Sequence, residues 1–248
     1  MLSLSFLGFA FYAMVLIGAF AVRSAAGFGA GLIAVPMLAF VLPVPTAVAI
    51  AAIFTTVTSA GQIGRDWRQI AWQQFLLLSL FTVIGIGLGF YFLQTSDEKT
   101  LRRGLGVFLV LYSIYALWAR GTSPVLPARW RGALAVGAGI AGGFFGALFG
   151  GGAGPIYVIY FNSLRLEREA FRVTMSTVVF VAGAARIAGY ANLGFYRAST
   201  LTLLAAGLPL VMVGSWLGDR LAHHLNPRIF GALVGGLVLL AGAVLFLR

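Results

Sequence analysis

Two glycine-rich stretches are the parts of this chain whose residue types and spacing could bind a ligand. The first is residues 27–31, with the sequence GFGAG, and the second is residues 150–155, with the sequence GGGAGP. Glycine disfavours a helix interior, so we expect each stretch to interrupt a helix, with Pro155 in the first turn of the next one. A helix that begins there presents unpaired N–H groups and partial positive charge, which favour an anion.

Arg186 is the third residue with chemical potential, because it lies inside the apolar stretch 181–190. A charge within an apolar span is costly, so it usually faces a cavity or a partner. The guanidinium group can bind an oxyanion through two parallel hydrogen bonds. The alternative is that the span ends early and Arg186 extends to the membrane surface. Ser176 and Gly183 share its helical face, which favours the first reading.

Small polar side chains complete the predicted site. Thr55, Ser59 and Gln62 follow a spacing of four and three residues, which places them on one helical face. Such side chains hydrogen-bond an oxyanion or pack between helices, and packing is favoured for Thr55 and binding for Gln62. Asn162 ends a short segment, where a helix cap is the alternative role. The predicted substrate-binding residues are Gly29, Gly31, Gly151, Gly152, Gly154, Arg186, Gln62, Ser59, Ser176 and Asn162.

Composition places these residues in a polytopic helical membrane protein. Of 248 residues, 60% are hydrophobic and 9% are charged, and the mean hydropathy is +0.99. The net charge of +11 lies in short loops, which is typical of membrane proteins and does not indicate nucleic-acid binding. Arg23 fits the same pattern: it could guard the inner mouth of a pathway, but an anchor at the inner membrane surface is the favoured interpretation. The chain has no cysteine, which excludes disulfides and thiolate catalysis.

The chain divides into ten apolar segments, of which the second and seventh are short. A polar linker, residues 120–131, separates two halves, so residues 1–122 and 123–248 are predicted to be two repeats. The predicted segments are residues 2–22, 31–42, 46–63, 71–93, 101–118, 132–149, 155–162, 170–190, 201–223 and 229–247.

The two halves align in order. Residues 29–31 match residues 152–154, and the glycines at 85 and 89 match those at 214 and 218. Five segments per half is an odd number, so the second half should be inverted relative to the first, as in many secondary transporters. The loop arginines favour both termini outside, in a bacterial-type cytoplasmic membrane.

The sequence predicts no enzyme, metal site or cofactor. The six acidic residues lie in loops or at span ends, so they form no proton relay inside the membrane. His223 and His224 are adjacent, and adjacent side chains diverge on a helix, which disfavours a shared metal ion. No nucleophile lies beside a base, and no phosphate-binding loop is present.

The paired glycine breaks, Pro36 and the tripeptide at 66–68 (DWR) together resemble the TauE/SafE family of sulfite and organosulfonate exporters. One departure is Ile159, which stands at the place of Pro36 in the second half. The resemblance implies a small sulfite-like or sulfonate-like anion as substrate. Our hypothesis is export driven by the membrane potential, with the substrate held near the midplane by the N–H groups of Gly31 and Gly154 and by Arg186. Ion-coupled uptake and a non-transporting accessory subunit are the alternatives, and a homo-oligomer is left open.

Overall fold

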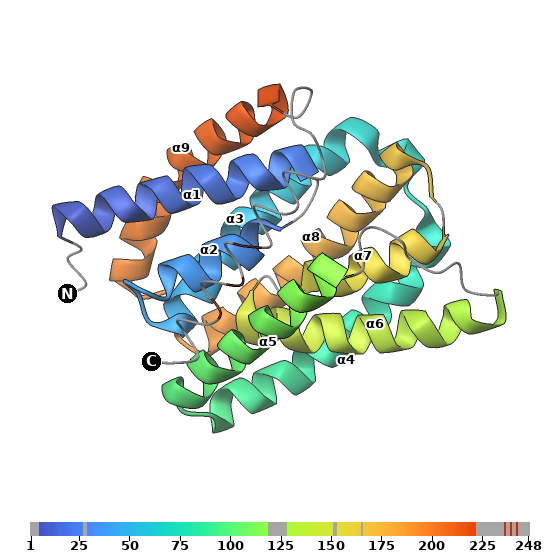
Figure 1. The fold of residues 1–248 in the computed structure, drawn as a ribbon, viewed down its shortest axis with the longest axis horizontal. Coiled ribbons are helices and arrows are strands. Elements are labelled where there is room, and N and C mark those ends of the chain that lie inside the picture. The colour runs from blue at the N-terminus through green and yellow to red at the C-terminus, as the bar shows by residue number, and fades with distance from the viewer. Residues whose placement is uncertain are drawn as a thin grey trace.

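The computed structural model describes residues 5–26, 29–118, 128–150, 153–164 and 166–221, together with 236, 239 and 242. Within these residues the chain is all helical and has no strand, as predicted (Figure 1). The helices are α1 (Phe6–Ala26), α2 (Ala30–Leu38), α3 (Val44–Asp66), the 3-10 helix η1 (Trp67–Gln69), α4 (Trp72–Thr95), α5 (Glu98–Trp118), α6 (Ala128–Phe149), α7 (Ala153–Leu164), α8 (Arg168–Asn192) and α9 (Ala198–Leu221). The tenth predicted segment lies almost wholly outside the described residues.

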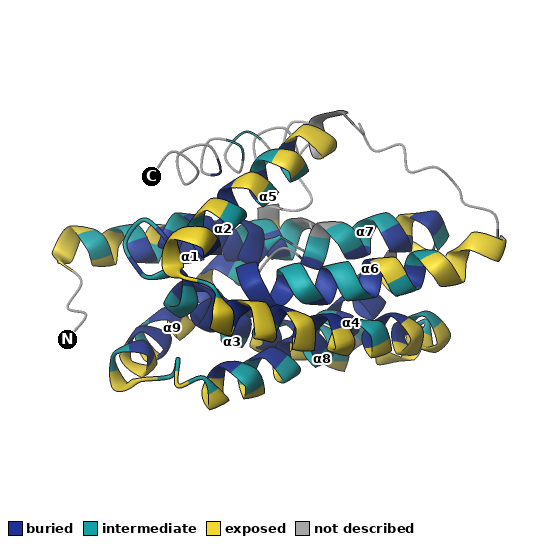
Figure 2. Ribbon diagram, turned by 90° about the horizontal axis from the view of Figure 1, so that it is seen from below, coloured by how far each residue is buried: buried dark blue, intermediate teal, exposed yellow. Residues whose placement is uncertain are grey.

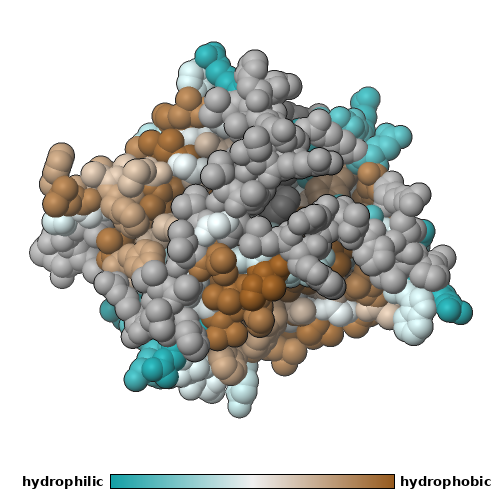
Figure 3. Space-filling view, in the orientation of Figure 1, coloured by the Kyte–Doolittle hydropathy of each residue, from teal (hydrophilic) through white to brown (hydrophobic). Residues whose placement is uncertain are grey.

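Six of the described helices are long and apolar enough to cross a membrane: α1, α3, α4, α6, α8 and α9. Their outward faces carry large apolar side chains, such as Leu76, Leu80 and Leu88 on α4, whereas buried residues gather inside the bundle (Figure 2). On the face shown in Figure 3, apolar side chains form patches on the left and below the centre, and the most hydrophilic side chains lie toward the edges. This surface suits lipid contact, and the chain is a multi-pass membrane protein.

The helices are interrupted at both glycine stretches. α1 ends at Ala26 and α2 begins at Ala30, while α6 ends at Phe149 and α7 begins at Ala153. Gly29 has a φ of 99° and Gly150 a φ of 65°, a backbone conformation that side chains with a Cβ rarely adopt. Gly27, Phe28, Gly151 and Gly152 lie outside the described residues. The prediction of two short helices, α2 and α7, each following a break, is confirmed.

Glycines allow α4 and α6 to pack backbone against backbone. A Cβ atom at Gly85 would stand 2.1 Å from the carbonyl oxygen of Ile140, and one at Gly89 would stand 2.8 Å from that of Phe144. Gly87, which is exposed, has no such neighbour within 4 Å. Close approach of small residues is a main source of helix association in membranes.

α1 and α9 pack in the same way on the other side of the molecule. A Cβ atom at Gly214 would stand 2.5 Å from the carbonyl oxygen of Ile17, and one at Gly218 would stand 2.2 Å from that of Ala21. In Figure 1, the pair α1 and α9 and the pair α4 and α6 lie on opposite sides of α3 and α8, and α1 and α6 run in opposite directions.

The central helices α3 and α8 also pack closely. A Cβ atom at Gly183 would stand 2.0 Å from the Oγ1 atom of Thr56. Along the same interface, the Ser176 hydroxyl donates a hydrogen bond of 2.6 Å to the Oε1 atom of Gln62. The short helix α2 packs against α1 and α3, and all its residues except Met37 are buried. These contacts fix the ends of the broken helices next to the central pair.

The glycine packing predicts the effect of a side chain at the α4–α6 interface. Gly85→Val should lower the free energy of unfolding by about 1–3 kcal/mol, because the new side chain would overlap the backbone at Ile140. Gly87→Val, two residues away on the exposed face, is the matched control and should change stability far less. Thermal unfolding of the purified variants in detergent measures both. Equal losses for the two variants would contradict the packing argument.

Candidate functional site

A cavity lies between the two helix breaks. Its volume is about 30 Å³, which is room for about two water molecules. Four glycines from the two breaks line it, together with two arginines and the starts of α2 and α7. The described lining residues are Arg23, Gly29, Ala30, Gly31, Thr55, Gly150, Ala153, Gly154, Tyr157, Met175, Val179, Ala182 and Arg186.

Arg186 reaches the cavity from α8 and is only 2% exposed. Its Nη1 atom donates hydrogen bonds of 3.0 Å to the carbonyl oxygen of Gly146 and of 2.7 Å to that of Gly150. Its Nε atom donates to the carbonyl oxygen of Ala182 at 3.2 Å. The alternative that Arg186 extends to the membrane surface is therefore wrong, because the side chain turns inward.

The Arg186 contacts explain how the break after α6 is held. The last carbonyl groups of a helix lack partners within the helix and carry partial negative charge. A guanidinium group satisfies both needs at once, since it is a multiple donor and a cation. Arg186 therefore stabilises the end of α6 and lies at the cavity through the same side chain.

Arg23 is a second buried cation that the sequence reasoning missed. It lies in the last turn of α1, is 7% exposed and lines the same cavity. Its Nη2 atom donates a hydrogen bond of 2.6 Å to the Ser59 hydroxyl, which itself donates to the carbonyl oxygen of Thr55 at 2.7 Å. The interpretation of Arg23 as a surface anchor is wrong, because α1 continues to Ala26, beyond the predicted end near residue 22, and packs this turn into the bundle.

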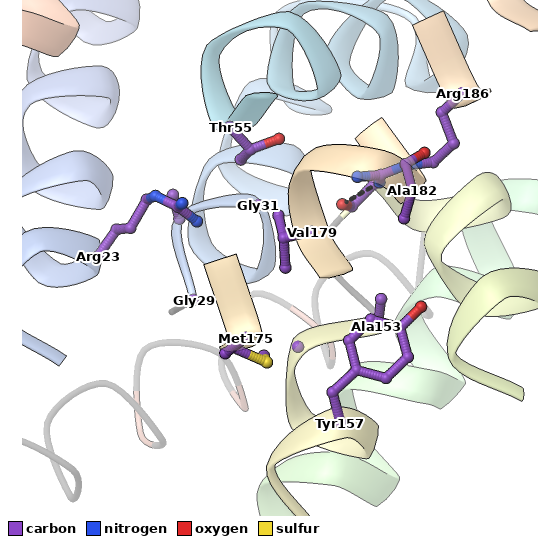
Figure 4. Close-up of a pocket in the computed structure, with 13 residues that line it drawn as sticks. Arg23, Gly29, Gly31, Thr55, Ala153, Tyr157, Met175, Val179, Ala182 and Arg186 are labelled. Atoms are coloured by element: carbon purple, nitrogen blue, oxygen red, sulfur yellow. Dashed lines mark hydrogen bonds between the residues drawn. The ribbon is translucent and has the colours of Figure 1, made fainter. Parts of the chain in front are cut away.

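Figure 4 shows the two arginines extending toward the cavity from different sides, with Gly31 and Val179 between them in this view. All six acidic residues of the chain are described, and none of them lines the cavity. The start of α2 adds partial positive charge, because its N-cap residue Gly29 has no side chain that could cap the first N–H groups. The cavity is therefore electropositive and suits an anion.

The structure brings some of the predicted site residues together and separates others. Gly29, Gly31, Gly154 and Arg186 line the cavity, whereas Gly151 and Gly152 lie outside the described residues. The remaining predicted residues, Ser59, Gln62, Ser176 and Asn162, are not among the described lining residues.

Each of these four residues has another place in the structure. Ser59 lies behind Arg23 and accepts its hydrogen bond. Gln62 and Ser176 bond to each other across the α3–α8 interface. Asn162 is exposed near the end of α7. Thr55, for which the sequence favoured packing over binding, is the residue of the predicted polar face that lines the cavity.

Tyr157 is a further cavity residue that the sequence reasoning did not identify. Its ring lies at the cavity, and its hydroxyl is 3.0 Å from the Oγ1 atom of Thr82 on α4, at hydrogen-bond distance. A Cβ atom at Gly142 on α6 would stand only 2.2 Å from the Tyr157 ring, so the glycine makes room for the tyrosine. A tyrosine that follows a glycine break within one turn is the signal that could have identified it.

The described residues contain no group of three or more His, Cys, Asp or Glu side chains that could hold a metal ion. The contacts offered by the cavity are instead hydrogen-bond donors and positive charge. This is the chemistry of binding an anion.

Comparison with known proteins gives one match. A family model described as "Sulfite exporter TauE/SafE" matches residues 11–245, nearly the whole chain, and confirms the resemblance found in the sequence. The matched range includes both glycine stretches and every described residue of the cavity. No curated protein and no solved structure matches the chain.

The geometry of the second break predicts the effect of a methyl group at Gly150. Gly150→Ala should lower the free energy of unfolding by more than the roughly 1–2 kcal/mol expected for a non-glycine residue in the left-handed conformation. The further loss is expected because the new Cβ atom would stand 2.9 Å from Val35 Cγ2. Gly194→Ala is the matched control, since Gly194 has a φ of 70° but no atom within 4 Å of the added Cβ. Thermal unfolding in detergent compares the two. A smaller loss at Gly150 than at Gly194 would contradict the close contact at the break.

Proposed function

The chain belongs to the TauE/SafE family of sulfite exporters, and from this premise we propose that it exports a small sulfur-containing anion through the cavity between the helix breaks. The observation that carries the proposal is the pair of buried arginines at a cavity that no acidic side chain lines. A buried cation needs a compensating negative group, and a bound anion supplies it. The family consists of transporters, which is why we interpret the anion as cargo and not as a structural ion.

The proposed binding groups come from both breaks. Backbone N–H groups at Gly29, Gly31 and Gly154 would donate to the oxyanion, as helix starts commonly do. Gly151 and Gly152 stay in the proposed site because they connect two residues that line the cavity, Gly150 and Ala153.

Side chains supply the rest of the proposed site. Arg186 and Arg23 provide positive charge, and Ser59 holds Arg23 in place. Gln62 and Ser176 would act indirectly, by joining α3 to α8. Asn162 remains a prediction from the sequence.

Two inverted repeats, residues 1–122 and 123–248, are part of the proposal. Adding 123 to Ile17 and Ala21 gives Ile140 and Phe144, and adding 129 to Gly85 and Gly89 gives Gly214 and Gly218. The α1–α9 contact therefore uses the same positions as the α6–α4 contact, with the halves exchanged. The opposite directions of α1 and α6 agree with inversion (Figure 1). A transporter of this plan exposes its central site to each side in turn by movement of one repeat against the other.

The membrane potential gives the proposed direction. An inside-negative potential of 100 mV is worth about 2.3 kcal/mol per charge and drives an anion outward. Uptake of an anion against this potential needs a coupling ion. An acidic side chain at the cavity could carry a proton together with the anion, but none of the six acidic residues lines the cavity. We therefore favour export across the bacterial-type cytoplasmic membrane, with both termini outside, over ion-coupled uptake.

Sulfite flux in proteoliposomes tests the proposed function. With purified protein, an imposed inside-negative potential of 100 mV should hold the sulfite concentration outside the liposomes about fiftyfold above that inside for each unit of transported charge. Arg186→Gln at equal protein content is expected to reduce the flux, and protein-free liposomes give the background. Flux that ignores the potential and follows a proton or sodium gradient would support coupled uptake instead. Absence of both flux and thermal stabilisation by sulfite would favour an accessory subunit.

Cysteine labelling tests the proposed orientation, and the chain suits it because it has no cysteine of its own. Asp97→Cys, just before α5, should react with a membrane-impermeant maleimide on intact cells. Gln69→Cys, just before α4, should react only after the membrane is permeabilised, because the loop at its position is predicted to face the cytoplasm. Both positions are exposed, so accessibility alone does not distinguish them. The reverse pattern would overturn the orientation.

A further inference from the structure

We infer that the cavity selects its anion by charge and size, and prefers a small divalent oxyanion to a monovalent sulfonate. The inference rests on the proposed function and narrows the substrate class of the same site. It starts from the two arginines, Arg23 and Arg186, which are 7% and 2% exposed and line one cavity.

The groups that contact the two guanidinium groups are neutral. Arg23 donates to the Ser59 hydroxyl, and Arg186 donates to the carbonyl oxygens of Ala182, Gly146 and Gly150. These acceptors satisfy N–H groups but carry no net charge. The end of α6 offers Arg186 only partial negative charge, and the starts of α2 and α7 at the cavity add partial positive charge.

Acidic side chains do not change this balance. The chain has six, and five of them are exposed: Asp97, Glu98, Glu167, Glu169 and Asp219. The sixth, Asp66, is at the far end of α3 and does not line the cavity. The cavity therefore holds two formal positive charges with no formal negative charge among its described lining residues.

A divalent anion neutralises this site, whereas a monovalent anion leaves one buried positive charge. Uncompensated charge at membrane depth is costly, so the divalent complex should be the more stable one and the easier one to carry across. The cavity is small, at about 30 Å³, and its lining side chains are packed among the helices. A sulfonate with a longer organic group therefore needs more rearrangement of the lining than an oxyanion with one sulfur atom does.

A pair of anions of almost the same shape separates charge from size. Sulfate and methanesulfonate are both tetrahedral and similar in size, but sulfate carries one more negative charge. Each is used as a competitor of sulfite flux in proteoliposomes, at a pH above the second ionisation of sulfurous acid. Sulfate should compete at least about tenfold better than methanesulfonate in the wild-type protein, because only sulfate balances both arginines. A longer monovalent sulfonate without a second charged group, propane-1-sulfonate, should compete more weakly than methanesulfonate.

Variants then test whether the arginines cause the preference. Arg23→Gln removes one cavity charge and should lower the ratio of sulfate to methanesulfonate competition by about tenfold. Arg23→Lys keeps the charge and should keep the preference. Arg220→Gln is the matched control, because it removes the same charge from an exposed arginine that lies over the Trp216 ring. Thermal unfolding and size-exclusion chromatography check that each variant is folded.

Failure of this inference differs from failure of the proposed function. Sulfite flux with equal competition by the two anions, or with no competition by sulfate, leaves the transporter in place and overturns the preference for charge. An unchanged ratio in Arg23→Gln overturns the role of the arginine. If that variant does not fold, the wild-type ratio still decides the main claim. Absence of sulfite flux in the wild-type protein would instead overturn the proposed function itself.

Discussion

The hydrogen bonds from Arg186 to the carbonyl oxygens of Gly146 and Gly150 are the interaction on which the rest of this structure depends. A helix that stops inside a membrane leaves carbonyl groups without partners in a medium that offers no water. Arg186 donates from one nitrogen atom to the Gly150 carbonyl oxygen and also to that of Gly146, which accepts the Gly150 N–H as well, and it places its charge at the cavity. The break and the cation therefore need each other: the break supplies acceptors for a buried arginine, and the arginine makes the break tolerable.

Close helix packing lets this arrangement persist. Glycine contacts bring α4 close to α6 and α1 close to α9 through their backbones, and they bring α8 close to α3 through the Thr56 side chain. The short helices α2 and α7 begin at the cavity, where the first residues of a helix carry partial positive charge. Large apolar side chains lie on the outside, where lipid replaces the water that a soluble protein would face, and others, such as Phe20, Phe54 and Phe161, fill the core. The closest helix contacts rely on small residues, which is the pattern expected in membranes.

The sequence predicted the parts of this site that depend on local chemistry. Glycine runs within apolar segments indicate helix breaks wherever the chain packs, and an arginine inside a span must turn inward or reach the surface. It did not predict Arg23, because that residue stands at the end of a segment, where a loop anchor and a buried cation have the same local pattern. Only the tertiary contact with Ser59 distinguishes them. Gln62 and Ser176 show the opposite error, since two polar side chains suited to a ligand satisfy each other across α3 and α8.

The two arginines also bear on how the proposed repeats would share one anion. Arg23 lies on α1, and adding 123 gives Gly146 on α6, whose carbonyl oxygen accepts a hydrogen bond from Arg186. The contact of α1 with α3 through Arg23 and Ser59 and the contact of α6 with α8 through Gly146 and Arg186 join corresponding helices, although Arg186 does not match Ser59 at either offset. In the proposed repeats one cation comes from each half, so an anion between them would be bound by both. Movement of one half against the other would then separate the two arginines and weaken the binding of the anion.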